Sequence, residues 1–208
     1  MIAVVDYKKG NLKSVERGLA ACGAEVLVTD APEGITAASA IVLPGVGAFA
    51  DAMATLEKTG QADAIRETVA AGVPFLGICL GMHLMFEGGE EHAEGSPVRG
   101  LGLLPGTVGC LPRLDAAGQP HKIPHVGWNT VEATDEVLFA GIPQGSYFYF
   151  THSFAAPDST YTCGRTTHSV TFPSAVRCSH AFGVQFHPEK SSDAGAKLLQ
   201  NFVDLVKG

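Results

Sequence analysis

The stretch Pro74-Phe75-Leu76-Gly77-Ile78-Cys79-Leu80-Gly81 ends an apolar run on a cysteine that has a glycine two residues to either side. The pattern Gly-x-Cys-x-Gly has the form of a nucleophile elbow, in which a strand turns sharply into a helix and leaves no room for side chains at the two glycines. Such a turn would set the Cys79 sulfur over the first N–H groups of the helix, where partial positive charge favours the thiolate. A buried cysteine at the end of a core strand fits the motif equally well.

Strands and helices alternate on both sides of this elbow in the first half of the chain. Apolar runs bounded by turn residues predict strands, and apolar residues at helical spacing predict helices. This order favours a mainly parallel sheet with helices on both faces. The predicted strands are 2–6, 24–29, 40–43 and 73–78, and the predicted helices are 11–22, 48–58, 62–71 and 80–87.

The pattern changes after about residue 95, where short apolar stretches broken by Gly, Pro and Asn predict antiparallel strands. One more strand, 182–186, and a last helix, 194–206, follow. We therefore expect an α/β fold with a doubly wound, mainly parallel sheet flanked by helices, an antiparallel β extension in the second half, and a single domain over residues 1–208. The predicted antiparallel strands are 106–111, 125–128, 146–154, 161–166 and 174–178.

Composition argues against several functional classes. The net charge of −7 over 208 residues gives no electrostatic footprint for nucleic acid or acidic membranes. No apolar run approaches the ~20 residues that span a bilayer, and the first residues are typical of a strand rather than a signal peptide. The five cysteines are widely spaced and include no Cys-x-x-Cys pair, so we expect neither a disulfide framework nor a zinc site. A reducing cytoplasm fits this cysteine usage.

A second motif, Phe186-His187-Pro188-Glu189, follows the last predicted strand. Pro188 blocks a helix and keeps His187 extended, so Glu189 should point to the same side as the imidazole. The pair offers a base and a carboxylate that orients it. A strand-end histidine beside a solvated glutamate is the alternative, which the Cys79 elbow makes the weaker one. The order nucleophile, histidine, acid differs from that of the α/β-hydrolases.

A third motif, Pro44-Gly45-Val46-Gly47, ends the predicted strand 40–43. A glycine-rich strand-to-helix turn can aim a backbone N–H at an oxyanion, and the residue after a nucleophile often supplies a second donor. The N–H groups of Val46 and Leu80 are therefore candidates for an oxyanion hole. A phosphate-binding turn or a plain connector also fits the glycine pair alone.

With these motifs, the chain resembles the class I, or triad, glutamine amidotransferases. It is most similar to their glutaminase subunits of imidazole glycerol phosphate synthase, from histidine biosynthesis. The Pro-Gly-Val-Gly-Ala-Phe and Gly-Trp-Asn stretches narrow the resemblance to these subunits, and it covers essentially the whole chain. The matching stretches are 5–7, 10–12, 14–15, 43–49, 77–82, 125–129, 149–153 and 183–191.

The resemblance implies a specific reaction. Cys79 would attack the side-chain amide of glutamine, His187 would shuttle protons and Glu189 would orient His187, so that a glutamyl thioester forms as ammonia leaves. Ammonia would pass through a tunnel to a cyclase subunit, a (β/α)₈ barrel, in a heterodimer that makes imidazole glycerol phosphate. A tunnel is physically reasonable because ammonia released into water would be protonated and lost as a nucleophile. The resemblance implies no cofactor and no metal.

The resemblance also assigns a glutamine site and a partner surface. Glu91 would pair with the substrate ammonium, although a solvated acidic run at Glu90-Glu91 is the alternative. Two departures stand out, since His83 replaces the usual Gln and Lys8 replaces the usual Gly. Trp128 could be an interface anchor or a core residue. The substrate residues are Gly45, His83, Glu91, Thr151, His152 and Ser153, and the partner-facing residues are Asn11, Trp128, Tyr149 and Lys190.

Three other functions compete with this interpretation. A glutaminase serving another acceptor, such as pyridoxal phosphate synthesis, would share the catalytic motifs but not the Gly-Trp-Asn stretch. A free-standing hydrolase, such as a γ-glutamyl peptidase, would be fully active without a partner. A non-catalytic domain would have no need for Cys79, His187 and Glu189 together.

Overall fold

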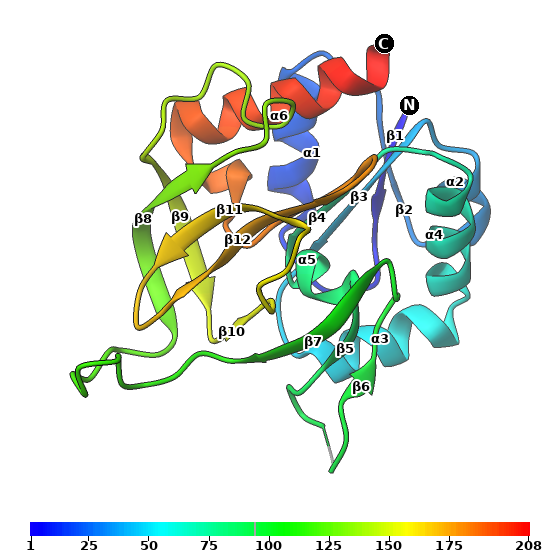
Figure 1. Ribbon diagram of the computed structural model, residues 1–208. Coiled ribbons are helices and arrows are strands. Elements are labelled where there is room, and N and C mark those ends of the chain that lie inside the picture. The colour runs from blue at the N-terminus through cyan, green and yellow to red at the C-terminus, as the bar shows by residue number, and fades with distance from the viewer. Residues whose placement is uncertain (94) are drawn as a thin grey trace.

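The first half of the chain forms the doubly wound arrangement that the sequence predicts (Figure 1). In the computed structural model, which describes residues 1–93 and 95–208, the main sheet has nine strands. Its parallel part contains, in spatial order, β2 (Val26–Thr29), β1 (Ile2–Val5), β3 (Ala40–Gly45), β4 (Phe75–Cys79) and β13 (Ala181–Val184). Neighbouring parallel strands bring their carboxyl ends to one edge of the sheet, where folds of this kind place their sites.

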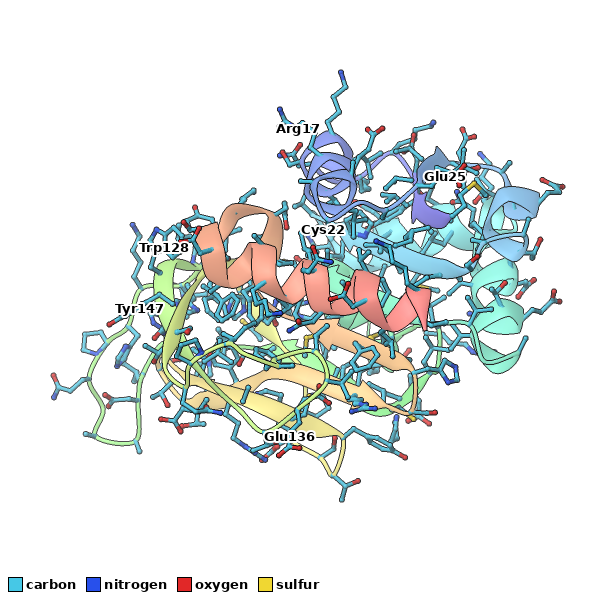
Figure 2. The ribbon with its side chains drawn as sticks, turned by 90° about the horizontal axis from the view of Figure 1, so that it is seen from above. Arg17, Cys22, Glu25, Trp128, Glu136 and Tyr147 are labelled. Carbon is cyan, nitrogen blue, oxygen red and sulfur yellow. The ribbon has the colours of Figure 1, made fainter. Side chains whose placement is uncertain are left out.

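Helices cover both faces of the parallel strands. One face carries α1 (Leu12–Ala21) and α6 (Ser192–Lys207), and the other carries α2 (Pro32–Thr36), α3 (Phe49–Lys58), α4 (Gln61–Ala70) and α5 (Leu80–Leu84). Within β3, Val42 packs on the α1 and α6 side and Ile41 on the other, because successive strand residues point to opposite faces. Figure 2 shows α1 and α6 together on their face. Among the described helices, none combines the length and the apolar character needed to cross a membrane.

The second half extends the same sheet with antiparallel strands, as predicted. Beyond β13 follow β12 (Thr171–Cys178), β11 (Thr162–Thr167), β8 (His125–Ala133) and β9 (Ser146–His152). A second sheet contains β10 (Phe154–Ala155), β7 (Leu104–Cys110), β5 (Phe86–Gly89) and β6 (Val98–Arg99). The turn from β9 into β10 carries the chain from the first sheet to the second, next to the end of β4 (Figure 1).

One predicted helix is wrong in its second half. The helix expected over residues 80–87 ends at Leu84, and Phe86–Gly89 form β5, which pairs with β6 and β7. A Cβ on Gly89 would lie 2.5 Å from the Phe49 ring, so this segment passes too close to α3 for a side chain. Glycine favours such close passages and disfavours a helix interior, and pairing with β7 then decides for a strand.

Candidate active site

Cys79 lies at the sharp turn between β4 and α5, as the elbow motif predicts. Its backbone has φ 55° and ψ −107°, a left-handed conformation that is costly for a residue with a side chain. A Cβ on Gly77 would lie 2.6 Å from the Gly81 carbonyl oxygen, and a Cβ on Gly81 would overlap the Leu43 carbonyl. Gly77 is therefore required by the tight turn of the elbow itself, and Gly81 by the close packing of the elbow against β3.

His187 and Glu189 form a buried pair beyond the end of β13. The His187 Nδ1 atom lies 2.9 Å from a Glu189 carboxylate oxygen, and their side chains are 4% and 2% exposed. His187 is extended as predicted, but Pro188–Lys190 form a short 3₁₀ helix, η1, rather than an extended segment. The Ser191 hydroxyl donates to the His187 carbonyl at 2.6 Å and so fixes the start of this turn. The carboxylate thus reaches the ring through a turn, not through strand alternation.

The electrostatics of His187 favour the protonated ring. Burial lowers the pKa of His187, but the Cys79 sulfur and the Glu189 carboxylate outweigh burial and raise the pKa to about 9. The Nε2 atom is buried and makes no hydrogen bond of good geometry within the described part of the chain, so Cys79 acts on the ring through proximity and charge. The site therefore holds an imidazolium at neutral pH with one N–H free for a reacting group.

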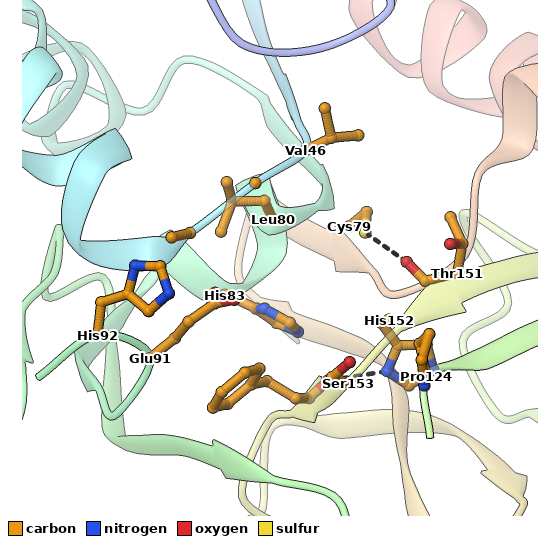
Figure 3. Close-up of a pocket in the computed structure, with 13 residues that line it drawn as sticks. Val46, Cys79, Leu80, His83, Glu91, His92, Pro124, Thr151, His152 and Ser153 are labelled. Carbon is orange, nitrogen blue, oxygen red and sulfur yellow. Dashed lines mark hydrogen bonds between the residues drawn. The ribbon is translucent and has the colours of Figure 1, made fainter. Parts of the chain in front are cut away.

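A pocket of about 370 Å³ opens beside Cys79 (Figure 3). It brings together residues from the ends of β3 and β4, from α5, from the segment after β5 and from the β9–β10 turn. The Cys79 sulfur lies 3.9 Å from the Thr151 carbonyl oxygen across the pocket mouth. Of the residues predicted for the oxyanion and glutamine sites, those in the lining are Val46, Leu80, His83, Glu91, Thr151, His152 and Ser153.

Gly45 is the one predicted substrate residue that does not line the pocket. It is buried, and a Cβ at this position would overlap the Tyr7 hydroxyl and lie 3.2 Å from the Leu80 Cβ. Gly45 is needed because β3 approaches Tyr7 closely, so its contribution to the site is to place Val46. The lining also includes Gly47 and Ala48 from the glycine-rich turn after β3, and three residues that no motif indicates, His92, Pro124 and Phe154.

Glu91 is held by the first turn of α3 rather than solvated in an acidic run. One carboxylate oxygen accepts the Phe49 N–H at 3.0 Å, which satisfies a free donor at the helix start. Burial raises the pKa of the Glu91 carboxyl, the Phe49 N–H opposes this rise, and the side chain is half-buried at the pocket. This arrangement leaves the second oxygen available for a cation.

Three buried histidines are neutral beside the pocket. Burial lowers the pKa of His83 to about 4, of His125 to about 4 and of His152 to about 3. His152 Nδ1 donates to the Phe154 carbonyl at 2.8 Å, which leaves its Nε2 to accept from His125 Nδ1 at 3.0 Å. These two hydrogen bonds fix the tautomers of His125 and His152. The pocket wall therefore presents neutral polar groups.

The buried histidines predict a loss of stability in weak acid. In the folded state, His83 and His152 take up a proton only when pH falls to about 4 and about 3, respectively. In the unfolded chain both histidines take up a proton near the ordinary pKa of 6.5. The free energy of unfolding should therefore fall as pH drops below 6.5 towards these values. Each group contributes up to about 1.4 kcal/mol per pH unit. Urea unfolding of His152→Asn should show lower stability at neutral pH and a shallower decline towards about pH 5. Exchange of the exposed His92 for Asn is the control, and equal pH slopes for both variants and the parent would contradict this assignment.

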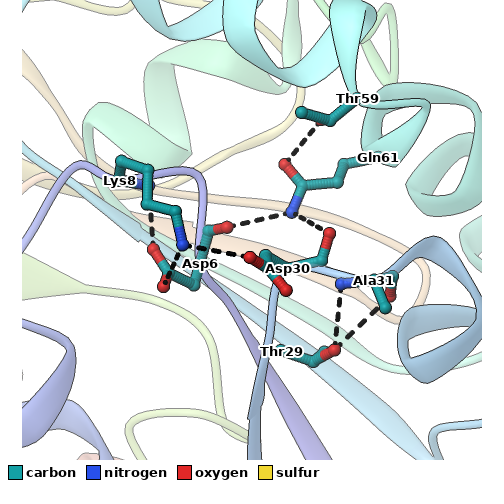
Figure 4. A network of polar contacts seen from close by, with 7 residues as sticks. All are labelled: Asp6, Lys8, Thr29, Asp30, Ala31, Thr59 and Gln61. Carbon is teal, nitrogen blue, oxygen red and sulfur yellow. Dashed lines mark hydrogen bonds and ion pairs between the residues drawn. The ribbon is translucent and has the colours of Figure 1, made fainter.

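Lys8, at the position where the resemblance implies Gly, has a left-handed backbone conformation with φ 65°. Figure 4 shows its polar contacts. Its N–H donates to Asp6 at 2.8 Å, and its ammonium pairs with Asp6 and Asp30 at 3.2 and 3.0 Å. The fully buried Gln61 amide donates to the Asp6 and Asp30 carbonyls, both at 3.0 Å, which joins the carboxyl ends of β1 and β2 to α4. The turn that places Tyr7 under Gly45 therefore persists without glycine.

The residues expected to face a partner lie on the β8–β9 hairpin and its neighbours. Trp128 is 53% exposed, which rules out the core alternative, and its ring meets Tyr149 edge-on at 6.1 Å. The Lys190 ammonium lies 5.9 Å from the Tyr149 ring centre. Asn11 is exposed at the start of α1, which packs against η1. Figure 2 shows Trp128 and Tyr147, another exposed aromatic, close together at the edge of the molecule.

No metal-binding cluster of three or more His, Cys, Asp or Glu side chains occurs in residues 1–93 and 95–208. The Cys79, His187 and Glu189 side chains, together with two N–H groups at strand ends, are suited to acyl transfer through a covalent cysteine intermediate. All five cysteines are free thiols.

Comparison with known proteins gives the family of this chain. A family model described as glutamine amidotransferase class-I matches residues 3–206. Curated relatives named imidazole glycerol phosphate synthase subunit HisH include one from Moorella thermoacetica, 49% identical with 99% of this chain and 95% of the relative covered, and one from Desulfitobacterium hafniense, 48% identical with 97% and 93% covered.

Solved structures share the fold at low sequence identity. A crystal structure described as glutamine amidotransferase superposes with a TM-score of 0.75 at 19% identity and covers both chains fully. The glutaminase domain of Trypanosoma brucei CTPS with bound acivicin gives a TM-score of 0.67 at 15% identity, with 99% of this chain and 93% of that chain covered. These structures support the α/β fold with its mainly parallel sheet. The chain belongs to the class-I glutamine amidotransferases and, within them, to the family of imidazole glycerol phosphate synthase subunit HisH.

Proposed function

We propose that this chain hydrolyses glutamine through a thioester on Cys79 and delivers the ammonia to a cyclase subunit for the synthesis of imidazole glycerol phosphate. The observation that carries this proposal is the position of Cys79, at the junction of β4 and α5, between a pocket with a half-buried carboxylate and the buried His187–Glu189 pair. Family membership supports the substrate class, and the geometry of the site supports the proposed roles.

In this mechanism the Cys79 sulfur attacks the side-chain carboxamide carbon of glutamine. The new carbon–sulfur bond forms, the carbon–nitrogen bond breaks, and His187 Nε2 gives its proton to the amide nitrogen, which leaves as ammonia. Glu189 stabilises the imidazolium through its contact with Nδ1. Water then adds to the thioester carbon and gives a proton to His187, the carbon–sulfur bond breaks, and glutamate leaves as the Cys79 thiolate is restored. The N–H groups of Val46 and Leu80 would stabilise the negative oxygen in both steps.

Substrate recognition would use the polar groups on the opposite wall of the pocket. The free oxygen of Glu91 would pair with the α-ammonium of glutamine. The Thr151–Ser153 segment, with neutral His152, would supply hydrogen bonds without adding a charge that competes with the ammonium. The Cys79 sulfur and the Glu91 carboxylate then hold the two ends of one small amino acid.

The partner would be a (β/α)₈-barrel cyclase that forms a heterodimer with this chain, since the relatives are named as a subunit of a synthase. The exposed Trp128 and the half-buried Tyr149, with Lys190 beside Tyr149 and Asn11 at the start of α1, would form the docking surface, because aromatic residues are enriched at binding hot spots. We also propose that residues 1–208 act as one glutamine amidotransferase domain without a cofactor. A cytoplasmic location would suit the free cysteines.

The test is a competition between two nitrogen sources in the assembled complex. The complex is given glutamine with a heavy-nitrogen amide together with unlabelled ammonium in excess. We expect the heavy label to dominate the product, because ammonia passes directly from Cys79 to the cyclase. If the product carries the label in the proportion found in the ammonia free in solution, direct transfer is contradicted. If glutamine supports no product formation at all, the proposed function is contradicted.

The turn after β3 predicts that the partner activates the glutaminase. Gly45 and Gly47 flank Val46, and Gly47 has φ +103°, so this turn has the freedom to rotate the Val46 N–H away from the site. One missing oxyanion donor lowers turnover by about 10²–10³. We therefore expect slow hydrolysis by the chain alone and faster turnover with the cyclase and its nucleotide substrate. Equal turnover with and without the liganded partner would contradict this switch.

A matched pair of substitutions tests the same turn. Gly47→Pro is unsuitable because proline cannot adopt a positive φ. Gly47→Ala strains the turn only through the positive φ of this position. The new Cβ would lie in open space, since the nearest atom would be Lys9 Cδ at 3.9 Å. Gly72→Ala introduces comparable strain at φ +95°, also in open space but outside the pocket. Of these two variants, only Gly47→Ala is expected to weaken the stimulation of glutamine hydrolysis by the partner.

A further inference from the structure

A buried relay of side chains leads from the pocket wall to the Cys79 sulfur. His83 Nε2 lies 2.7 Å from the Gln185 side-chain oxygen, and the Gln185 nitrogen lies 3.9 Å from the Cys79 sulfur. Gln185 is fully buried and His83 is 4% exposed. The Gln185 N–H donates to the Ser174 carbonyl at 3.0 Å, so its backbone is fixed just beyond β13 and only the amide orientation remains to be set.

The tautomer of His83 decides which end of the Gln185 amide faces the sulfur. With a proton on Nε2, His83 donates to the amide oxygen, and the amide NH₂ group turns towards Cys79. With the proton on Nδ1, Nε2 becomes an acceptor, the amide turns over, and its oxygen faces the sulfur. The first arrangement offers a hydrogen bond to a thiolate, whereas the second places two electron-rich atoms against each other.

The His83 ring is placed to hold the first arrangement. Its Nδ1 atom has no hydrogen-bond donor or acceptor among the described residues, while the ring lines the pocket (Figure 3). A ligand donor in the pocket would therefore meet a lone pair on Nδ1 and keep the proton on Nε2. Burial also lowers the pKa of His83 to about 4, so the ring is neutral and has one proton to place.

We propose that Gln185 is a positioning residue for the Cys79 thiolate, and that His83 fixes the Gln185 amide with its NH₂ group towards the sulfur. The proposal rests on the proposed function, because it concerns the ionised form of the nucleophile. It gives His83 a different task from the one expected of the Gln that it replaces, since its Nε2 atom is directed at Gln185 and only Nδ1 is left for the pocket. His83 therefore acts on the chemistry mainly through Gln185.

The proposal can be tested by measuring what fraction of Cys79 is ionised. The rate at which iodoacetamide alkylates Cys79, followed across pH by mass spectrometry of the peptide that contains it, reports the ionisation of the thiol. In Gln185→Met, which keeps the volume and loses the donor, alkylation near neutral pH should be about tenfold slower and the titration midpoint about one pH unit higher. Gln185→Glu, which places a carboxylate near the sulfur, should shift the midpoint further. The exposed Cys110 in the same samples is the internal reference.

A second pair of variants separates the relay from packing. Gln at position 83 can still donate to the Gln185 oxygen, so His83→Gln should keep the Cys79 titration midpoint of the parent. His83→Leu removes the donor and should raise the midpoint, as Gln185→Met does. Circular dichroism establishes that each variant is folded. Equal midpoints in Gln185→Met and the parent, or in the two His83 variants, would overturn the proposal.

Failure of this proposal can be distinguished from failure of the proposed function. Alkylation is measured on the full chain without glutamine or partner, so a complex that fails to use glutamine leaves the alkylation result standing. Conversely, an unchanged midpoint overturns the relay even if glutamine-dependent synthesis is normal.

Discussion

Replacing Cys79 with Ala is expected to abolish glutamine hydrolysis while ammonia-dependent synthesis by the complex continues. Only amide cleavage requires the sulfur, and added ammonia bypasses that step. Loss of a nucleophile that works with a base lowers turnover by about 10⁴ or more. The variant should fold normally, because Ala fills the same elbow and the two required glycines remain in place.

The matched control for this prediction is Cys110→Ala. Cys110 is an exposed thiol at the end of β7 and does not line the pocket, so its loss should leave glutamine turnover unchanged. Both activities are measured on the same preparation of each complex. Substantial glutamine-dependent synthesis by Cys79→Ala would contradict the assignment of the nucleophile, and loss of the ammonia-dependent activity would show damage to the complex instead.

Loss of His187 should cost more than loss of its carboxylate partner. His187→Asn removes the proton shuttle and should lower kcat by about 10⁴ or more, whereas Glu189→Gln keeps a hydrogen-bonding group at 2.9 Å and should cost about 10²–10⁴. The measurement is steady-state glutaminase turnover in the partnered complex at matched folding. A larger loss in Glu189→Gln than in His187→Asn would reverse the assigned roles.

The same pair sets the alkaline limit of activity. Because Cys79 and Glu189 raise the pKa of His187 to about 9 against the effect of burial, the imidazolium that protonates the leaving amide nitrogen persists below that pH and is lost as pH rises through it. Turnover should therefore decline above about pH 9. Glu189→Gln removes one of the groups that raise this pKa, so its decline should begin at a lower pH.

The elbow and the contact between His187 and Glu189 were predictable because short motifs mark them. Gly77 is required by the tight strand-to-helix turn itself, whereas the contact of Gly81 with β3 is distant in sequence. Pro188 fixes the backbone next to His187, although Glu189 reaches the ring through η1 and not through the predicted strand alternation. The sequence also indicated the doubly wound half, since runs such as Ile41–Leu43 are buried on both faces of the sheet.

Features that depend on packing between distant segments could not be predicted. The end of α5 at Leu84 follows from pairing between β5 and β7, which lie apart in the sequence. Gly45 is required because β3 packs closely against Tyr7, and no local sequence pattern indicates that contact. Gln185 lies within the motif that contains His187, but its direction towards Cys79 emerges only when β13 pairs with β4.

The hydrogen-bonded histidines were likewise hidden in the sequence. His125 and His152 come from β8 and β9, and their contact depends on the antiparallel register that places them opposite each other. Their low pKa values arise from burial, which a sequence pattern does not report for polar residues. His125 begins β8 and His152 ends β9, and both strands contain other polar residues, so no local pattern singles out the two histidines.

Trapping the covalent intermediate tests the central claim most directly. The complex is mixed with glutamine and nucleotide substrate, quenched in acid during turnover, digested and analysed by mass spectrometry. The mechanism predicts a γ-glutamyl group on the peptide that contains Cys79, absent before glutamine is added and absent in Cys79→Ala. Full glutamine turnover with Cys79 unmodified in every quenched sample, or a glutamyl group on another residue, would contradict it.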